Sequence, residues 1–202
     1  SISAAEDGSP VPVGGGFADE VGGVMMAYGL LLALFARERT GRGQKVEASL
    51  LGGQIEMGRL MFQIYLLTGR LPAQSLMRQA RSPLWYIYKC QDGKWLALAM
   101  LQPDRFWHQF CEGLGIQGLE KDPRFENQLV RGDHMNEIVA VVRERFCSRP
   151  RDEWVRLCEA AGLIVAPVQN YEEVARDPQV IANEYVTEVD DPIHGKVKVA
   201  GI

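Results

Sequence analysis

The sequence has 202 residues, of which 47% are hydrophobic and 24% are charged. These proportions lie near the averages for soluble globular domains, which excludes a disordered tail, a collagen-like repeat and a low-complexity segment. The 22 lysines and arginines are outnumbered by 26 aspartates and glutamates, so the formal net charge is -4. Because there is no basic surplus to neutralise phosphates, we expect no nucleic-acid partner.

Both ends of the sequence predict a piece of a longer protein. Residues 1–18 are polar and rich in glycine and proline, and they predict a loop. The sequence opens without a methionine and closes on GKVKVAGI, which resembles an unfinished strand. Nothing near the start has the charged segment, apolar segment and cleavage site of a signal peptide, so we expect a cytoplasmic protein.

A long helix is predicted from Val21 onward. Its longest apolar run, residues 24–36, is shorter than the roughly 20 residues that span a membrane, and three charged residues follow it at once. We therefore expect a buried helix and no membrane partner. The apolar residues recur at three- and four-residue intervals, namely Val21, Val24, Met25, Tyr28, Leu31, Leu32 and Phe35.

The ends and the glycines of this helix carry further predictions. Asp19 stands where an N-cap belongs, and the Thr40–Gly43 segment is typical of a helix stop. Glycine inside a helix costs about 1 kcal/mol relative to alanine. Gly22, Gly23 and Gly29 therefore indicate close packing or the approach of a ligand to the backbone.

The next segments complete a first domain over residues 1–70. Residues 44–50 alternate enough to predict a short strand, and residues 51–67 predict a second long helix. Residues 71–82 are polar and aperiodic, and we interpret them as a linker. A second domain is expected over residues 83–202.

The second domain opens on a predicted β-hairpin. Two apolar runs within residues 84–100 flank Asp92-Gly93, a pair that favours a tight hairpin turn. Four aromatic side chains crowd this hairpin, and they favour the aromatic core of a sheet over the lining of a substrate cleft. They are Trp85, Tyr86, Tyr88 and Trp95.

Helices and a final pair of strands follow the hairpin. Helices are predicted over residues 104–114, 127–146, 151–161, 171–176 and 179–185, and Asp122–Phe125 predicts a turn. Residues 164–168 form a short apolar stretch, and strands are predicted over residues 186–189 and 196–199.

Metal and disulfide chemistry are not expected. The four cysteines lack CxxC spacing, and without a secretion signal we expect reduced thiols in the core. The three histidines do not pair with one another, with cysteine or with carboxylates at the spacing of a zinc site. The cysteines are Cys90, Cys111, Cys147 and Cys158, and the histidines are His108, His134 and His194.

Asp19 is the strongest candidate for a chemically reactive residue. A carboxylate at a helix N-terminus has its anionic form stabilised by the helix dipole and by free amides, and it can attack an activated acyl group. The alternative is that Asp19 is only a structural cap. Gly14, Gly15 and Gly16 before it read as a flexible loop when taken alone, because they lack the spacing of a dinucleotide-binding fingerprint.

Two further candidates have plain structural alternatives. Gln102 follows the second hairpin strand, at the edge of a possible site or in a surface loop. Four basic residues near the end of the first helix could meet phosphates, or could form a solvated helix end favoured by the negative C-terminal dipole. They are Arg37, Arg39, Arg42 and Lys45.

The sequence resembles the class III CoA-transferase family (CaiB/BaiF type), which includes formyl-CoA transferase, carnitine CoA-transferase and α-methylacyl-CoA racemase. Residues 18–54 carry the most specific match, an Asp and Gly before an apolar helix and then Arg-x-x-Thr-Gly-x-Gly-Gln. The hairpin at residues 86–100 is a second match. A third is a series that includes Asp122–Phe125, Arg131, Trp154, Ala161-Gly162, Pro167-Val168, Glu173-Val174 and Asp177–Gln179.

The resemblance implies an α/β fold. Residues 1–70 would be the C-terminal portion of an open α/β CoA-binding domain, and residues 83–202 a smaller α+β domain. The N-terminal Rossmann-like part that supplies most CoA contacts would lie outside this chain. In such proteins the two chains of a homodimer interlock, so an interlocked homodimer is the implied partner, with acyl-CoA and a carboxylic acid as substrates.

The resemblance also implies the chemistry. Asp19 matches the nucleophilic aspartate, and transfer of CoA would pass through an aspartyl anhydride and an aspartyl-CoA thioester. Coenzyme A would be a substrate, no metal would take part, and Gly15, Gly16, Gly22 and Gly23 would lie against it. This chain alone would be inactive, since much of the CoA site would be missing.

Two alternatives remain open. The racemases of this family move a proton at the α-carbon, and there Asp19 would serve as an acid or base. They carry Glu-Pro after the hairpin where this sequence has Gln102-Pro103, and glutamine does not take a proton at neutral pH, which disfavours racemisation. Residues 74–83 also lack the glycine-rich loop of formyl-CoA transferase. The second alternative is a non-catalytic truncated or split subunit.

Overall fold

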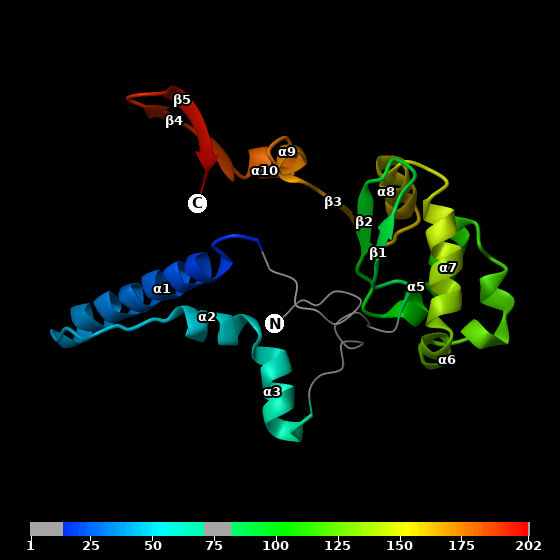
Figure 1. The fold of residues 1–202 in the computed structure, drawn as a ribbon, viewed down its shortest axis with the longest axis horizontal. Helices are drawn as coiled ribbons and strands as arrows, with labels where there is room; N and C mark the ends of the chain where they lie inside the picture. Colours follow the sequence, from blue (N-terminus) through cyan, green and yellow to red (C-terminus); the bar gives the residue numbers. More distant parts are fainter. Residues whose placement is uncertain (1–13, 71–81, 202) are drawn as a thin grey trace. The chain divides into compact units, whose positions relative to one another are not determined.

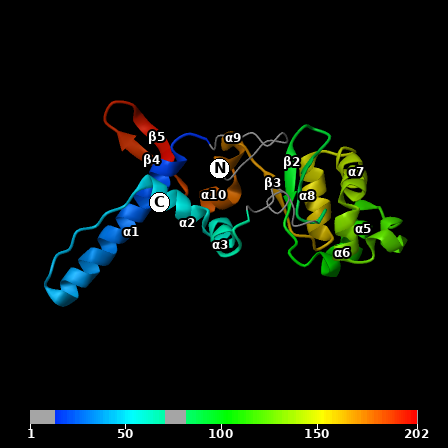
Figure 2. The same cartoon turned by 60° about the horizontal axis from the view of Figure 1, so that its bottom comes forward.

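The computed structural model describes residues 14–70 and 82–201. Helices and strands together make it a mixed α/β protein, as predicted. The chain divides into two compact units, residues 1–77 and 78–202, which are described separately below (Figures 1 and 2). The division falls within the segment interpreted as a linker, of which residues 71–81 lie outside the described part.

The described part of the first unit contains helices α1 (Phe17–Thr40), α2 (Leu50–Met57) and α3 (Arg59–Thr68). The predicted N-cap is wrong, since α1 begins two residues before Asp19 and Gly16 caps it. Gly16 adopts a left-handed conformation with φ of 75°, which glycine reaches without steric cost, so the chain turns into the helix early. Asp19 thus lies inside the first turn.

The predicted strand at residues 44–50 is absent. Residues 42–49 are extended but pair with no strand among the described residues, and Leu50 begins α2. They run back along α1 instead (Figure 1). A Cβ added at Gly29 would lie 2.8 Å from Val46 Cγ1, so the missing side chain of Gly29 lets this segment approach the helix. A strand requires a hydrogen-bonding partner, whereas a helix surface offers none.

The predicted single helix over residues 51–67 is two helices. Gly58 separates α2 from α3 with φ of -92° and ψ of 7°, and its N–H still donates to the carbonyl of Gln54 at 3.0 Å. Ser49 caps α2 and its hydroxyl accepts from the Gly52 N–H at 3.0 Å. Glycine is a weak helix former, so a helical run ends readily at this position.

The prediction that the first helix is buried is wrong for the residues described. Val24 is 69% exposed and Leu31 is 66% exposed, while Gly22 is the buried residue of α1. Among the described residues, the less exposed face of α1 includes Val21, Gly22 and Gly29, while many of its larger apolar side chains are uncovered. By length and composition α1 is apolar enough to cross a membrane, with mean hydropathy 1.4 in its most apolar window, a property that core helices of soluble proteins share.

The second unit is built on a three-stranded antiparallel sheet in the order β1 (Ile87–Lys89), β2 (Trp95–Leu98), β3 (Val165–Val168). The predicted hairpin is confirmed, with Tyr88 opposite Leu96. Gly93 takes a φ of 78° at its turn, as a tight hairpin requires. The apolar stretch near residue 165 supplies the third strand, which pairs with β2.

The helices of this unit largely follow the predictions. The predicted helix over residues 127–146 is interrupted at His134, while Asn127 accepts from the amides of Leu129 and Val130 as its N-cap. The remaining bounds are α5 (Pro103–Leu114), η1 (Leu119–Lys121), η2 (Pro123–Phe125), α6 (Gln128–Asp133), α7 (Met135–Phe146), α8 (Arg151–Ala160), α9 (Tyr171–Val174) and α10 (Pro178–Ala182).

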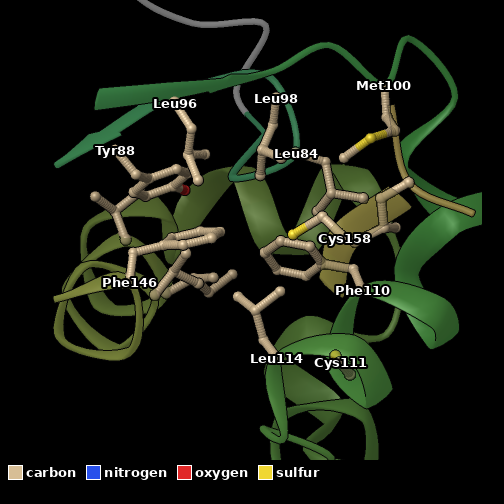
Figure 3. Packing of buried hydrophobic residues seen from close by; sticks show 14 of the residues in the cluster. Leu84, Tyr88, Leu96, Leu98, Met100, Phe110, Cys111, Leu114, Phe146 and Cys158 are labelled. Carbon is tan, nitrogen blue, oxygen red and sulfur yellow. The ribbon is translucent and has the colours of Figure 1, made fainter. Parts of the chain in front are cut away.

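The core of the second unit lies between the sheet and its helices. Figure 3 shows Tyr88 and Leu96 of the sheet facing Phe146, with Phe110 and Leu114 of α5 completing the cluster. Tyr88 stacks on Phe146 with ring centroids 4.9 Å apart. The predicted aromatic core is therefore correct for Tyr88. It is wrong for two other hairpin residues, since Trp85 and Trp95 are exposed.

Three of the four cysteines occupy this core as reduced thiols. Cys90, Cys111 and Cys158 are buried, and burial raises the pKa of Cys90 to about 11 and the pKa of the other two to about 12. Cys147 is exposed, so its predicted core position is wrong. It directly follows α7, and its thiol donates weakly to the carbonyl of Lys89 at 3.6 Å.

The unit ends in a hairpin of β4 (Val186–Asp191) and β5 (Gly195–Ala200), which confirms the last two predicted strands. An ion pair between the buried Arg151 and the partly exposed Glu173 ties the segment before this hairpin to the three-stranded sheet and its helices. The guanidinium of Arg151 donates to both carboxylate oxygens of Glu173, at 2.9 and 3.1 Å, and to the carbonyl of Val168 at 3.0 Å. Lys94 adds a bond to Glu173 at 2.7 Å.

We expect this ion pair to shape the acid unfolding of the second unit. Hydrogen bonds from Arg151 and then Lys94 lower the pKa of Glu173 to about 2, below its ordinary value of 4.5. The stability that the carboxylate supplies is thus complete above about pH 4.5 and declines as the pH falls toward 2. Glu173→Gln should flatten this part of a stability-against-pH curve measured by urea unfolding. Glu172→Gln, on an exposed neighbour, should leave it unchanged; identical curves for both variants would refute the expectation.

Candidate active site

Asp19 projects from the first turn of α1 and is exposed. The amides of a first helical turn have no intrahelical acceptors, so this turn has a partial positive charge that favours an anion. Glu20 lies beside Asp19, and its N–H already donates to the carbonyl of Gly16 at 2.9 Å. Among the residues described, no side chain or backbone amide is hydrogen-bonded to the Asp19 carboxylate, which leaves its oxygens accessible for chemistry.

The four glycines predicted to contact CoA lie in different surroundings. An added Cβ at Gly15 or Gly23 would meet nothing within 4 Å, so their backbone is open. Gly16 is exposed in its left-handed turn. Gly22 is buried, and an added Cβ there would lie 2.7 Å from Leu50 Cδ2. The open glycines flank Asp19, while Gly22 faces α2.

The first turn of α2 packs against the second turn of α1. A Cβ added at Gly53 would lie 3.0 Å from Val21 Cγ1 and 3.6 Å from the amide nitrogen of Gly22. The two helices thus cross through Gly22 and Gly53, one turn beyond Asp19. Gly53 was not predicted to belong near the site; the only signal for it was the Gly52-Gly53 pair inside a helical pattern.

The arrangement suits acyl chemistry at a carboxylate. An exposed carboxylate can attack an acyl carbon, and free amides at a helix start can stabilise the oxyanion that forms. Among the residues described, no cluster of histidine, cysteine and carboxylate side chains has the composition of a metal site.

The remaining sequence candidates lie at the surface. Gln102 is the N-cap of α5 and is exposed, with no capping bond from its side chain. The basic residues near the end of α1 are also exposed; Arg39 stacks over the Phe35 ring at 4.4 Å, and Lys45 pairs with Glu47 at 2.6 Å. These contacts agree with the alternative interpretation of the four basic residues, a solvent-exposed helix end.

The second unit contains a polar cavity of about 470 Å³ between α5 and residues 119–126. His108 and Glu120 in its wall are 2.8 Å apart, and this bond raises the pKa of His108. Its other lining residues are Asp104, Trp107, Lys121, Asp122, Pro123 and Glu126. All of these belong to the second unit, so the cavity does not include Asp19.

The mixed fold agrees with the proteins that the chain resembles in comparisons. The profile of "CoA-transferase family III" matches residues 1–202. The chain belongs to CoA-transferase family III, whose members include proteins of the CaiB/BaiF type.

The curated proteins that resemble this chain include a CoA-transferase and a racemase. The chain is 31% identical over 187 residues to (R)-2-hydroxy-4-methylpentanoate CoA-transferase of Clostridioides difficile, an alignment that covers 92% of this chain and 46% of the relative. It is 28% identical over 154 residues to human alpha-methylacyl-CoA racemase, with 76% and 39% covered. The chain thus spans about half the length of the curated relatives it matches, or less.

Solved structures agree on the fold. A CAIB/BAIF family protein from Brucella suis superposes with a TM-score of 0.78 at 24% identity, covering 93% of this chain and 49% of that one. Rv3272 from Mycobacterium tuberculosis superposes with a TM-score of 0.79 at 22% identity, covering 99% and 52%. At these identities the comparison supports the fold alone.

Proposed function

We propose that the protein containing this chain transfers coenzyme A from an acyl-CoA to a carboxylic acid, with Asp19 as the acyl acceptor. The single observation that supports this role most is the exposed carboxylate in the first turn of α1, without a hydrogen-bond partner among the described residues, in a chain that belongs to CoA-transferase family III. The backbone at Gly15, Gly16 and Gly23 is uncovered, so the CoA thioester can lie against it. Gly22 faces α2 instead.

The proposed cycle has four acyl exchanges. A carboxylate oxygen of Asp19 attacks the thioester carbonyl of the donor, the carbon–sulfur bond breaks, and a mixed anhydride and CoA thiolate form. The thiolate attacks the Asp19 carbonyl and releases the donor acid, leaving an aspartyl-CoA thioester. The acceptor carboxylate attacks this thioester and expels the thiolate again. The thiolate then takes the acceptor acyl group, and the Asp19 carboxylate is restored.

This route replaces one difficult exchange by steps between activated acyl groups. A free carboxylate is a poor acceptor for a thiolate, whereas an anhydride carbonyl is a good one. Each tetrahedral intermediate places negative charge on the former carbonyl oxygen. The amides of the first turn of α1 are available to stabilise that charge when it develops near Asp19.

Racemisation of an acyl-CoA is the second candidate function, and one named relative supports it. That reaction requires an acid and a base on opposite faces of the α-carbon. Asp19 would supply one of them, but the exposed Gln102 after the hairpin has no titratable group for the other. Incorporation of deuterium at the α-carbon in heavy water, without any acceptor acid, would favour the racemase.

The assembly and location are also proposals. We propose an interlocked homodimer, inactivity of this chain alone and a cytoplasmic location; the first two rest on the family resemblance and not on contacts within the chain. A subunit without catalytic activity is the third possibility. The chain covers 46% of its transferase relative, so the proposed reaction concerns the complete enzyme.

Chemical trapping tests the proposed role of Asp19. Hydroxylamine added during turnover should convert the aspartyl anhydride or thioester to a hydroxamate, which peptide mass spectrometry locates. We expect the adduct on Asp19 only when acyl-CoA is present. Glu20, an exposed carboxylate on the same turn, should stay unmodified and serves as the internal control. An active enzyme without an adduct at Asp19 would overturn the proposal.

A further inference from the structure

The side-chain amide of Gln54, in α2, is a buried donor without an acceptor. Its Nε2 atom is buried and has no hydrogen-bond partner among the residues described. Buried polar groups in native proteins are nearly always hydrogen-bonded, and the exceptions include groups that act in catalysis. An unpaired buried donor lowers stability, so this amide requires an explanation.

The segment that leads into α2 runs back along α1 toward its start (Figure 1). An added Cβ at Gly29 would lie 2.8 Å from Val46 Cγ1, and an added Cβ at Gly22 would lie 3.8 Å from Leu50 Cα. Four residues later along this segment, the contact has moved seven residues toward the N-terminus of α1. The second turn of α2 therefore follows in the direction of the first turn of α1.

This direction brings Gln54 to the turn that carries Asp19. Gln54 follows Leu50 by one turn of α2, and Asp19 precedes Gly22 by one turn of α1; residues three or four apart are neighbours on a helix surface. The two helices are close at this level, since an added Cβ at Gly53 would lie 3.6 Å from the Gly22 nitrogen. An unpaired donor and an unpaired carboxylate thus flank the same helix contact.

We infer that Gln54 is a further catalytic residue, whose amide donates a hydrogen bond to the oxyanion that forms on the Asp19 carbonyl. The inference rests on the proposed function of Asp19. When the CoA thiolate attacks the aspartyl anhydride, a carbon–sulfur bond forms and an electron pair moves onto the carbonyl oxygen. When the donor carboxylate leaves, that electron pair restores the carbonyl group.

The burial of the amide suits this role. The oxygen that becomes charged belongs to the side chain of Asp19, which can turn toward Gln54 although solvent does not reach the amide. A donor shielded from water stabilises a developing negative charge more strongly than a solvated one. Catalytic hydrogen bonds often tighten only during the reaction, which explains why Asp19 accepts no bond in this structure.

Gln54→Met tests the donor in the complete enzyme, because it removes the amide and keeps a side chain of similar length. The kcat for CoA transfer should fall by about 100-fold to 1000-fold, the effect of losing one oxyanion donor, with a smaller change in KM. The urea midpoint should stay equal or rise, since an unpaired buried donor is lost. Gln63→Met, the same change at an exposed position of α3, should keep kcat within about twofold.

Gln54→Glu tests whether this side chain lies near the charge. Its ionised carboxylate would repel the oxyanion, whereas its protonated form can donate to it, and the neighbouring Asp19 makes the introduced acid harder to ionise. The kcat relative to wild type should therefore rise at least about tenfold between about pH 8 and about pH 6. Gln63→Glu should show a constant ratio over this range.

The outcomes separate this inference from the proposed function. If wild type gives the Asp19 adduct but Gln54→Met keeps kcat within about twofold, the inference is refuted and the function stands. If kcat falls but both glutamate variants show the same pH dependence, the amide is only structural and the inference is again refuted. Wild type that is active without an adduct at Asp19 refutes the function and the inference together. If Gln54→Met does not fold, the comparison of the two glutamate variants decides.

Discussion

Replacing Asp19 with alanine is expected to abolish CoA transfer, lowering kcat by at least about 10⁴-fold, as loss of a nucleophile does in other acyl-transfer enzymes. Alanine removes both carboxylate oxygens that could attack the thioester. The neighbouring carboxylate in the first turn, Glu20, lies at a different position on the helix surface. The measurement is initial rate of acceptor acyl-CoA formation in the complete enzyme. Folding is checked by circular dichroism, because alanine is a good helix former and should keep α1 intact.

Glu20→Ala is the control for this prediction. Asp19 and Glu20 are both exposed acidic residues in the first turn of α1, so each substitution removes the same favourable interaction with the helix dipole. Only the loss of Asp19 should stop the reaction. Transfer that persists in Asp19→Ala, or that is lost equally in both variants, would show that Asp19 is not the nucleophile.

Replacing Trp154 with alanine is expected to destabilise the second unit by about 3–5 kcal/mol, the range for truncating a large buried aromatic residue. Trp154 is 1% exposed. Its ring meets Phe146 edge to face with centroids 5.2 Å apart, and its indole N–H donates to the carbonyl of Phe146 at 2.9 Å. The substitution removes packing from α8 and leaves that carbonyl without its donor.

Urea unfolding measures this loss, and Trp95→Ala is the comparison. Trp95 has a side chain of the same size on β2, but it is 43% exposed. We expect its removal to cost less than half as much, since a partly solvated ring gives up less buried area. A loss below about 1 kcal/mol for Trp154→Ala would contradict the assigned core.

Local signals explain why much of the second unit could be predicted from its sequence. Asp92-Gly93 identifies the β1–β2 hairpin, and Pro103 with Gly115 brackets α5. The interruptions at Gly58 and His134 had weaker signals, since a lone glycine or histidine is tolerated within helical patterns. The burial of the helices was harder to predict than their boundaries. The exposure of α1 depends on what surrounds it in space, which periodicity does not report.

The same distinction applies to the candidate site. The sequence predicts Asp19 and its neighbouring glycines as the site through the family resemblance of residues 18–54, since a carboxylate before an apolar helix is by itself equally typical of a cap. It does not identify the contact between Gly22 and Leu50, which joins two helices through the extended segment between them. It also places the N-cap three residues late, at Asp19 instead of Gly16, because the left-handed turn at Gly16 has no reliable signature beyond glycine itself.

The order of strands in the second unit has a consequence for biosynthesis. β1 and β2 are joined by a tight turn and can pair soon after both leave the ribosome, whereas β3 is separated from β2 by α5 through α8. Until β3 arrives, one edge of the nascent hairpin keeps unpaired amides and carbonyls, a state prone to association with other chains. Completion of the sheet therefore depends on late, long-range contacts, and we expect chaperone dependence to be greatest while α8 is being synthesised.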